Sequence, residues 1–389
     1  MPPIVIDVQN TPDLRDVVHR AVQALVEGQL VVFPTETVYG VAASALNAEA
    51  VDRLMNLKSR QPGQPLALSL KSADDAWDYV PSTSGLGRRL ARRCWPGPVT
   101  LVLDDNDHPD SLLRRLPESV QKAVCPSGTL GVRVPAHELV LDVLDMLAGP
   151  IALTSANRHG EPPATTAKVA IDALGDDVHM ILDDGESRFG EASSVVQVTD
   201  DGLKILRAGV VNESTLNRLS TFLVVVVCTG NTCRSPMGEA LMRNAIAKRI
   251  GCTDEELEDQ GVLVISAGIA AMSGGRASVQ SVDVMKERGL NIDDHASQPV
   301  TDRLVRHADL IFTMTNGHRA GLLAQWPEAA PRTHLLCPDG RDVSDPIGGP
   351  LELYARCAEQ IDNAIIQRVE EMDLDGLRPR TASDDSETE

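Results

Sequence analysis

Residues 224–236 read VVVVCTGNTCRSP: an apolar strand runs into a cysteine, a tight polar loop, and an arginine that precedes an amphipathic helix. Backbone N–H groups of a loop wrapped over a helix N-terminus point inward and bind phosphate oxygens, helped by the helix dipole. The same positive field favours a thiolate at Cys228, which can attack phosphorus. Arg234 can hold two further oxygens with its planar guanidinium. The stretch therefore predicts a phosphate-binding loop with a cysteine nucleophile at its base.

The other residues of this loop, called the cradle below (residues 228–235), are expected to support the phosphate site. Gly230 and Asn231 tolerate left-handed backbone, and Ser235 can donate a hydrogen bond to the sulfur. The alternative is a buried cysteine or half of a metal site, but no second ligand pair follows at short spacing, so we predict no metal here. The predicted phosphate-loop residues are Thr229, Gly230, Asn231, Thr232, Cys233 and Ser235.

Around the cradle, helix and strand patterns alternate as in a parallel sheet covered on both faces. We expect strands at 223–227, 262–266 and 310–314, and helices at 237–250, 279–288 and 350–372. Ligands of such sheets bind beyond the carboxyl ends of the strands, which is where Cys228 falls. In the turn-rich run 342–349, Asp345 is placed to protonate the leaving group and then to activate water. A simple Asp-Pro turn is the alternative for Asp345.

Residues 222–372 resemble the low-molecular-weight protein tyrosine phosphatase family. Besides the cradle, the resemblance rests on Ser266-Ala267-Gly268, His295, the run 308–315 and Asp345-Pro346. It implies a doubly wound parallel sheet, a phosphorylated protein as substrate and no cofactor. It also implies three catalytic residues: Cys228 as nucleophile, Arg234 as transition-state ligand and Asp345 as general acid.

Two departures from this family concern the substrate. Typical members carry Ile where Thr232 stands, and aromatic residues where Ile347-Gly348-Gly349 follow Asp-Pro. A phosphotyrosine ring needs an apolar slot, whereas phosphoarginine presents a polar guanidinium that a threonine hydroxyl can contact. The domain is therefore closer to the branch that acts on protein phosphoarginine, with tyrosine phosphatase as the alternative. A phosphate-sensing domain without activity is a further alternative, which the complete set of catalytic residues disfavours.

Arsenate reduction is another chemistry that uses this type of cradle, but it needs a closely spaced cysteine pair downstream. Cys252, Cys337 and Cys357 are single and widely separated in the sequence. Within the cradle, Cys233 can form a disulfide with Cys228 and protect it from overoxidation, or it can simply pack as a small residue.

The N-terminal half places basic and hydroxyl residues on loops between apolar strands, a pattern that gathers positive charge around a polyanion without a Walker loop. The segments that carry this pattern are 31–41, 58–66, 95–101, 131–135, 154–157, 193–196 and 205–211, the last of which is expected to be a strand. Residues 13–212 resemble the YrdC-like threonylcarbamoyl-AMP synthase family through these segments. The resemblance implies a twisted, mixed sheet with flanking helices and a concave basic face.

The family chemistry implied is the synthesis of threonylcarbamoyl-AMP from L-threonine, bicarbonate and ATP, for threonylcarbamoyladenosine in tRNA. Magnesium is expected with the nucleotide, and tRNA is an indirect partner through other modification proteins. The alternative is an RNA-binding module, which the net charge of −20 disfavours. Carried onto this sequence, Thr35 contacts threonine. The remaining ATP- and threonine-binding residues implied are Lys58, Arg60, Arg133, Ser155, Asn157, Ser194 and Arg207.

Length and composition fit two α/β domains in one chain of 389 residues. Seven scattered cysteines, the absence of an apolar run of about 20 residues and the lack of a leader predict a cytoplasmic enzyme with no membrane segment. We expect domains at 1–212 and 222–373, joined by a linker at 213–221. The acidic stretch 374–389 has too little apolar content to fold and is expected to be a disordered tail.

Overall fold

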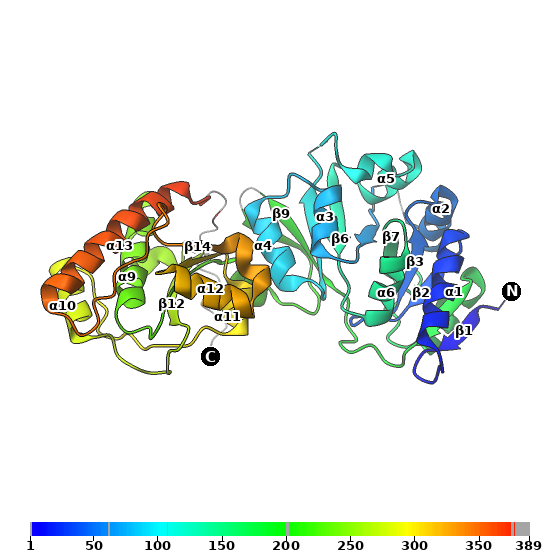
Figure 1. The fold of residues 1–389 in the computed structure, drawn as a ribbon. Coiled ribbons are helices and arrows are strands. Elements are labelled where there is room, and N and C mark those ends of the chain that lie inside the picture. Colours follow the sequence, from blue (N-terminus) through cyan, green and yellow to red (C-terminus); the bar gives the residue numbers. More distant parts are fainter. Residues whose placement is uncertain (1, 61–62, 107, 200–201, 375–376, 378–389) are drawn as a thin grey trace. The chain divides into compact units, whose positions relative to one another are not determined.

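The computed structural model describes residues 2–60, 63–106, 108–199, 202–374 and 377. The chain divides into two compact units, Met1–Leu219 and Ser220–Glu389 (Figure 1). The segment expected to be a linker contains helix α8 (Glu213–Ser220), whose Leu216 is fully buried in the core of the first unit. The exact domain boundaries remain a prediction. Most of the expected acidic tail, residues 375–376 and 378–389, lies outside the described residues.

The first unit contains a ten-stranded mixed sheet in the order β1-β8-β2-β3-β7-β4-β6-β5-β9-β10, which confirms the predicted fold class. Its strands are β1 (Ile4–Asp7), β2 (Val31–Phe33), β3 (Gly40–Ser44), β4 (Ala67–Ser69), β5 (Val99–Asp104), β6 (Thr129–Arg133), β7 (Ile151–Ser155), β8 (Met180–Asp183), β9 (Ser194–Thr199) and β10 (Gly202–Arg207). Its other helices are α1 (Leu14–Val26), α2 (Ala48–Leu57), α3 (Ala73–Tyr79), α4 (Gly85–Cys94), α5 (Glu118–Val124), α6 (Glu138–Met146) and α7 (Ala167–Leu174).

Helices cover the two faces of this sheet unequally. Because successive side chains of a strand point to opposite faces, the residues of each core show which helices lie on which face. On one face, residues such as Leu101, Leu130 and Val132 join a large core with helices α2, α3, α4, α5, α7 and α8. On the other face, the core consists of α1 and α6 packed on β2, β3, β7 and β8. Among the described residues, that second core does not extend over β4, β6, β5 and β9. This part of the sheet is therefore available for a binding site.

The last strand of the first unit is shorter than predicted. The sequence predicts a strand from 205 to 211, but β10 ends at Arg207. Gly209 then packs so closely on 192–194 that an added Cβ would lie 2.3 Å from the Ala192 carbonyl oxygen. Val210 donates its N–H to that same carbonyl, at 3.1 Å. This close packing turns the chain away from the sheet, and glycine permits it because it has no side chain.

The second unit is a four-stranded, fully parallel sheet in the order β12-β11-β13-β14. Cores on both faces of β11 show the doubly wound arrangement that the sequence predicts: α9, α10 and α13 lie on one face, and α11 and α12 on the other (Figure 1). The strands are β11 (Phe222–Cys228), β12 (Val262–Gly268), β13 (Leu310–Thr313) and β14 (Thr333–Leu335). The helices are α9 (Arg234–Ile250), α10 (Val279–Glu287), α11 (Asp302–His307), α12 (Asn316–Gln325) and α13 (Leu351–Glu371).

Every predicted element of the second unit is present, with shifted ends. Helix α9 begins at Arg234 rather than at 237, so the arginine of the cradle is already in the first turn. Strand β12 continues to Gly268, two residues beyond the prediction, because it pairs with β11 up to Cys228. In the described part of the chain, no helix is long and apolar enough to span a bilayer.

Candidate active sites

A cavity of about 550 Å³ lies in the first unit, on the part of the sheet face that α1 and α6 leave uncovered. Strand alternation supplies its floor: Thr129, Gly131 and Arg133 of β6 face it, while Leu130 and Val132 face the opposite core. A cavity of this size suits a ligand such as a nucleotide. Its polar lining comprises Thr35, Thr37, Tyr39, Arg60, Ser69, Thr100, Ser127, Thr129, Arg133, Thr154, Ser155, Ser193, Gln197 and Arg207.

Three arginines make the cavity strongly basic, and none of the described residues that line it is acidic. Burial lowers the pKa of Arg60, and the charge of Arg207 lowers it further. Burial likewise lowers the pKa of Arg207, with a further contribution from Arg133. These like charges therefore repel one another in a partly desolvated space, an arrangement that a bound polyanion would stabilise.

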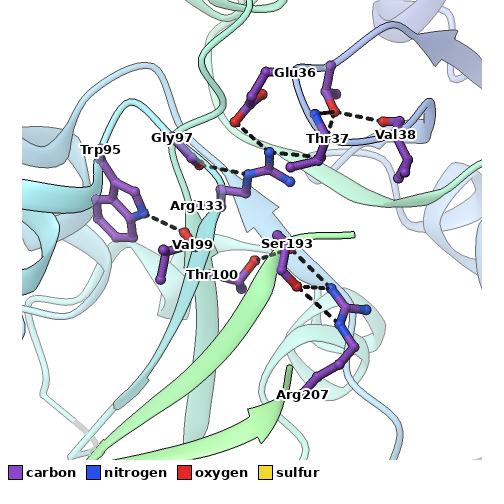
Figure 2. Close-up of polar contacts among 11 residues, drawn as sticks. Glu36, Thr37, Val38, Trp95, Gly97, Val99, Thr100, Arg133, Ser193 and Arg207 are labelled. Atoms are coloured by element: carbon purple, nitrogen blue, oxygen red, sulfur yellow. Dashed lines mark hydrogen bonds and ion pairs between the residues drawn. The ribbon is translucent and has the colours of Figure 1, made fainter. Parts of the chain in front are cut away.

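Arg133 is held by groups from two loops, as Figure 2 shows. Its Nη2 donates to Glu36 Oε1 at 2.7 Å and to Thr37 Oγ1 at 3.0 Å, and its Nε donates to the Gly97 carbonyl at 3.1 Å. Glu36 is 6% exposed and Arg133 is 7% exposed, so this is a buried ion pair. The pair fixes the guanidinium at the cavity, and removal of Glu36 would leave a buried charge without its counterion.

Lys58 and Asn157 lie behind the cavity wall rather than on it. Lys58 Nζ donates to the Ser155 carbonyl at 2.9 Å, to Asn157 Oδ1 at 2.8 Å and to the Asn157 carbonyl. Ser155, which does line the cavity, donates its hydroxyl to Asn157 Oδ1 at 2.5 Å. Burial and the neighbouring charge of Arg60 lower the pKa of Lys58 to about 8. Lys58, Ser155 and Asn157 therefore form one hydrogen-bonded network, whereas Arg60 Nη2 donates to Thr154 Oγ1 at 3.1 Å.

Ser194, in contrast, does not line the cavity. Its hydroxyl donates to the Val211 carbonyl at 2.8 Å, which fixes the segment that follows β10. The cavity is lined instead by the preceding residue, Ser193, whose Oγ lies 3.1 Å from Thr100 Oγ1 and accepts a 3.1 Å hydrogen bond from Arg207 (Figure 2). Thus Thr35, Arg60, Arg133, Ser155 and Arg207 line the cavity, and their binding of ATP or threonine remains a prediction. The sequence did not single out Ser193, which lines the cavity, or Glu36, which holds Arg133.

The cavity offers magnesium few ligands of its own. Within the described residues, no group of three or more His, Cys, Asp or Glu side chains could hold a metal ion. Glu36, which pairs with Arg133 through Oε1, has a second carboxylate oxygen, Oε2. In the described structure this oxygen is buried and makes no hydrogen bond. Magnesium is usually bound through substrate phosphates and water, so a nucleotide rather than the protein would supply most of its ligands.

The cradle of the second unit has the geometry of a phosphate site. Cys228 ends β11 and is 3% exposed, with Sγ 3.0 Å from Ser235 Oγ and 3.2 Å from the Asn231 N–H nitrogen that donates to it. In the described chain, the N–H groups of Gly230, Thr232 and Cys233 donate to no protein acceptor. These donors precede helix α9, so they can bind an anion next to the sulfur.

Asn231 fixes the shape of the cradle. It is fully buried and has a left-handed φ of +54°. The sequence suggests a left-handed conformation for Gly230 as well, but the φ of Gly230 is not positive. Its side-chain amide donates to Ser235 at 2.9 Å and to Ser266 at 2.8 Å, and His295 Nε2 donates to its carbonyl at 2.8 Å. The left-handed turn is therefore held by hydrogen bonds from the side chain and the main chain of one residue.

Arg234 and Asp345 meet at the open side of the cradle. Arg234 Nη2 donates to Asp345 Oδ2 at 2.6 Å, and the Asp345 side chain is 47% exposed. His318 lies nearby, with Nε2 2.8 Å from Thr229 Oγ1. Burial lowers the pKa of His318, with a further contribution from the charge of Arg234. The structure thus brings all three predicted catalytic residues together.

Thr232 and Cys233 follow the turn. An added Cβ on Gly230 would lie 3.6 Å from Thr232 Oγ1, so the hydroxyl lies beside the cradle backbone. Cys233 Sγ is 3.7 Å from the Tyr354 hydroxyl, and all seven cysteines are free thiols. A disulfide between Cys228 and Cys233 remains a prediction.

Fold and geometry define the class of protein: two α/β units, one with a basic nucleotide-sized cavity and one with a cysteine-based phosphate cradle. The sequence model of the Sua5–YciO–YrdC family, described as "Telomere recombination", matches residues 23–209. The model described as "Low molecular weight phosphotyrosine protein phosphatase" matches residues 223–377. The chain belongs to both families, as a fusion of the two domains.

Individual relatives match one half of the chain each. A threonylcarbamoyl-AMP synthase from Pyrococcus abyssi is 36% identical over 47% of this chain and 51% of its own length, so the chain spans about half of that relative. A putative threonylcarbamoyl-AMP synthase from Mycobacterium tuberculosis is 35% identical over 49% of this chain and 83% of its own length. A protein-arginine-phosphatase from Geobacillus stearothermophilus is 35% identical over 39% of this chain and 96% of its own length.

Among solved structures, a double variant of P. abyssi Sua5 matches 86% of this chain and 98% of its own length. The TM-score is 0.50 and the sequence identity is 24%. At that identity the match supports the fold alone.

Proposed function

We propose that the first unit forms threonylcarbamoyl-AMP from L-threonine, bicarbonate and ATP. The observation that carries this proposal is the group of Arg60, Arg133 and Arg207 around a cavity whose described lining has no acidic residue. A cavity of about 550 Å³ lies within the size range of small-molecule and cofactor sites. The net charge of −20 also disfavours an RNA-binding module.

The roles we assign within this cavity follow from the hydrogen bonds. The three arginines bind the phosphates, and magnesium bound to those phosphates would neutralise the departing pyrophosphate. Lys58 holds Ser155 and Asn157 in place, and the buried Thr35 Oγ1, which donates to the Val38 carbonyl at 2.7 Å, keeps the loop after β2 closed against the cavity. Positioning and charge stabilisation are expected to supply most of the rate. The product would serve tRNA modification through other proteins.

Pyrophosphate release tests the synthase proposal. The full chain should release pyrophosphate from ATP, and that release should depend on both threonine and bicarbonate. Arg207→Ala should lower kcat/KM by about 100-fold or more, because it removes a cavity charge. Arg158→Ala is the matched control: this arginine is half exposed, pairs with Asp177 and does not line the cavity. Pyrophosphate release that does not depend on threonine and bicarbonate would refute the proposal.

We further propose that the second unit is a cysteine-dependent phosphatase for phosphoarginine in proteins. The observation that supports this proposal is the 2.6 Å hydrogen bond from Arg234 Nη2 to Asp345 Oδ2 at the cradle of Cys228. The sulfur of Cys228 lies 3.0 Å from Ser235 Oγ. In this mechanism Cys228 attacks phosphorus, Arg234 binds the equatorial oxygens, and protonated Asp345 donates to the leaving nitrogen before activating water. Support for arginine over tyrosine comes from Thr232 beside the cradle backbone and from Gly348 and Gly349 after Asp345.

Matched peptides that carry phosphoarginine or phosphotyrosine distinguish the two substrates. Wild type should favour phosphoarginine in kcat/KM, and Cys228→Ser should hydrolyse neither peptide. Thr232→Ile should shift the preference towards phosphotyrosine by about tenfold, because an apolar side chain replaces a hydroxyl beside the phosphate. A preference that Thr232→Ile leaves unchanged would show that Thr232 does not select the substrate.

A further inference from the structure

Two neighbouring rows of side chains form the floor of the synthase cavity. In the first row, Arg133 of β6 pairs with Ser69 of β4. In the second row, Val102 of β5 pairs with Gly131 on one side and with Gln197 of β9 on the other. Two residues along a strand separate the rows, a spacing of roughly 7 Å. That spacing leaves room for a ribose between phosphates on the first row and a base on the second.

The second row is uncharged and nearly flat. Gly131 has no side chain, and a Cβ added there would lie 3.6 Å from Ala67 Cβ and 3.8 Å from Thr100 Cγ2. Ala67, Gly131 and Val102 therefore form a low apolar strip on the sheet, next to the hydroxyls of Ser127 and Thr129. A planar aromatic ring can lie on such a strip, whereas the arginines at the other end attract the phosphates.

Gln197 stands at the end of this strip and is the one carboxamide in the cavity lining that the structure describes. Its neighbours in the sequence, Val196 and Val198, are buried in the core on the opposite face, so alternation directs Gln197 to the cavity. In the described part of the chain, its side-chain amide has no hydrogen-bond partner. The amide therefore offers a donor group, its NH₂, and an acceptor oxygen to a ligand.

We propose that the second row binds the base of the nucleotide and that Gln197 determines which base is accepted, by pairing with adenine. The amide oxygen accepts from the exocyclic amino group, and the amide nitrogen donates to the adjacent ring nitrogen, the bidentate pairing that glutamine makes with adenine. This inference rests on the proposed synthase activity, since it takes ATP as the nucleotide. To that proposed activity the inference adds Gln197 as the residue that selects the base.

Purine riboside triphosphate, which lacks the exocyclic amino group of ATP, tests this pairing. Binding of both nucleotides to the full chain is measured by calorimetry, and pyrophosphate release is measured alongside. Wild type should bind ATP at least about tenfold more tightly than the analogue. Gln197→Ala and the similarly sized Gln197→Met should bind the two nucleotides within about twofold of each other, because the group that reads the amino group is gone.

Thr199→Ala is the matched control on the same strand, since Thr199 donates to the Gly202 carbonyl and does not line the cavity. This variant should keep the wild-type preference. The inference is overturned if wild type does not discriminate, or if both Gln197 variants discriminate as wild type does. ATP binding without threonine-dependent turnover would refute the synthase proposal and leave base recognition standing. Failure of ATP to bind at all would refute both.

Discussion

Gly268→Ala should disable the phosphatase site although residue 268 touches no substrate. Gly268 ends β12 under the cradle, and a Cβ there would lie 2.5 Å from the Thr229 carbonyl oxygen and 2.9 Å from the Asn231 nitrogen. Real Cβ atoms essentially never approach within 3.0 Å, so the cradle backbone must move. Overpacking of this kind costs about 1–3 kcal/mol of stability. A displacement approaching 1 Å at a catalytic loop can lower the rate by about 100-fold.

The assay for this prediction is phosphopeptide hydrolysis, with the unfolding transition of the second unit recorded in parallel. Gly321→Ala is the matched control: it lies in α12 of the same unit, and its Cβ would meet Ile269 Cδ1 at an ordinary 3.7 Å. Alanine is favoured over glycine inside a helix by about 1 kcal/mol, so this variant should be at least as stable and fully active. Gly268→Ala activity within twofold of wild type would refute the reasoning.

Three further changes test other parts of the sites. Asp345→Asn should lower kcat by roughly 10²- to 10⁴-fold on phosphopeptides and by much less on p-nitrophenyl phosphate, whose leaving group needs no acid; equal losses on both would argue against the acid role. Folding lowers the pKa of Lys58 from its ordinary 10.5 to about 8, so the charged form is disfavoured and the contribution of Lys58 to the stability of the nucleotide-free first unit should rise as pH rises from 8 towards 10.5. In thermal unfolding, wild type should therefore gain stability relative to Lys58→Met over this range, a comparison in which buried Cys94, whose pKa is raised to about 12, acts on both proteins alike. Glu36→Ala should destabilise the first unit by about 3–5 kcal/mol, since Arg133 is left buried without its carboxylate. Glu36→Gln removes the charge but keeps the shape and one acceptor oxygen, so in denaturant titration it should also destabilise the unit, though by less than Glu36→Ala; a cost near zero would show that the charge is unimportant.

The second fold was more predictable from sequence than the first because its signals are local. Four successive valines before Cys228 can be buried on both faces only in a central parallel strand, and β11 is that strand. In the first unit, by contrast, the sheet order joins strands far apart in the sequence, such as β5 with β9 and β1 with β8. Hydrophobic patterns show that such strands exist, but they do not show which strands pair.

The same distinction applies to the site residues. Cys228, Arg234 and the asparagine turn lie within one loop, so their roles follow from spacing. Ser193 and Ser194 are adjacent serines before two valines, and nothing in that local pattern shows which hydroxyl faces the cavity. Which serine faces the cavity depends on the pairing of β9 with β5. It also depends on Val211, which lies beyond the end of β10 and whose carbonyl accepts the hydrogen bond of Ser194. Glu36 was missed because its partner, Arg133, is distant in the sequence.

The two units bind phosphate by different physical means, and this difference has a measurable consequence. The first uses arginine side chains that repel one another, with Lys58 held in the wall behind them, so its ligand-free state carries unfavourable charge that a polyanion relieves. The second uses main-chain N–H groups, which carry no formal charge and do not titrate, together with one arginine that Asp345 already balances. Polyphosphate should therefore stabilise the first unit strongly, less so at high salt and above about pH 8, where Lys58 loses its proton. Phosphate binding by the cradle should depend much less on salt.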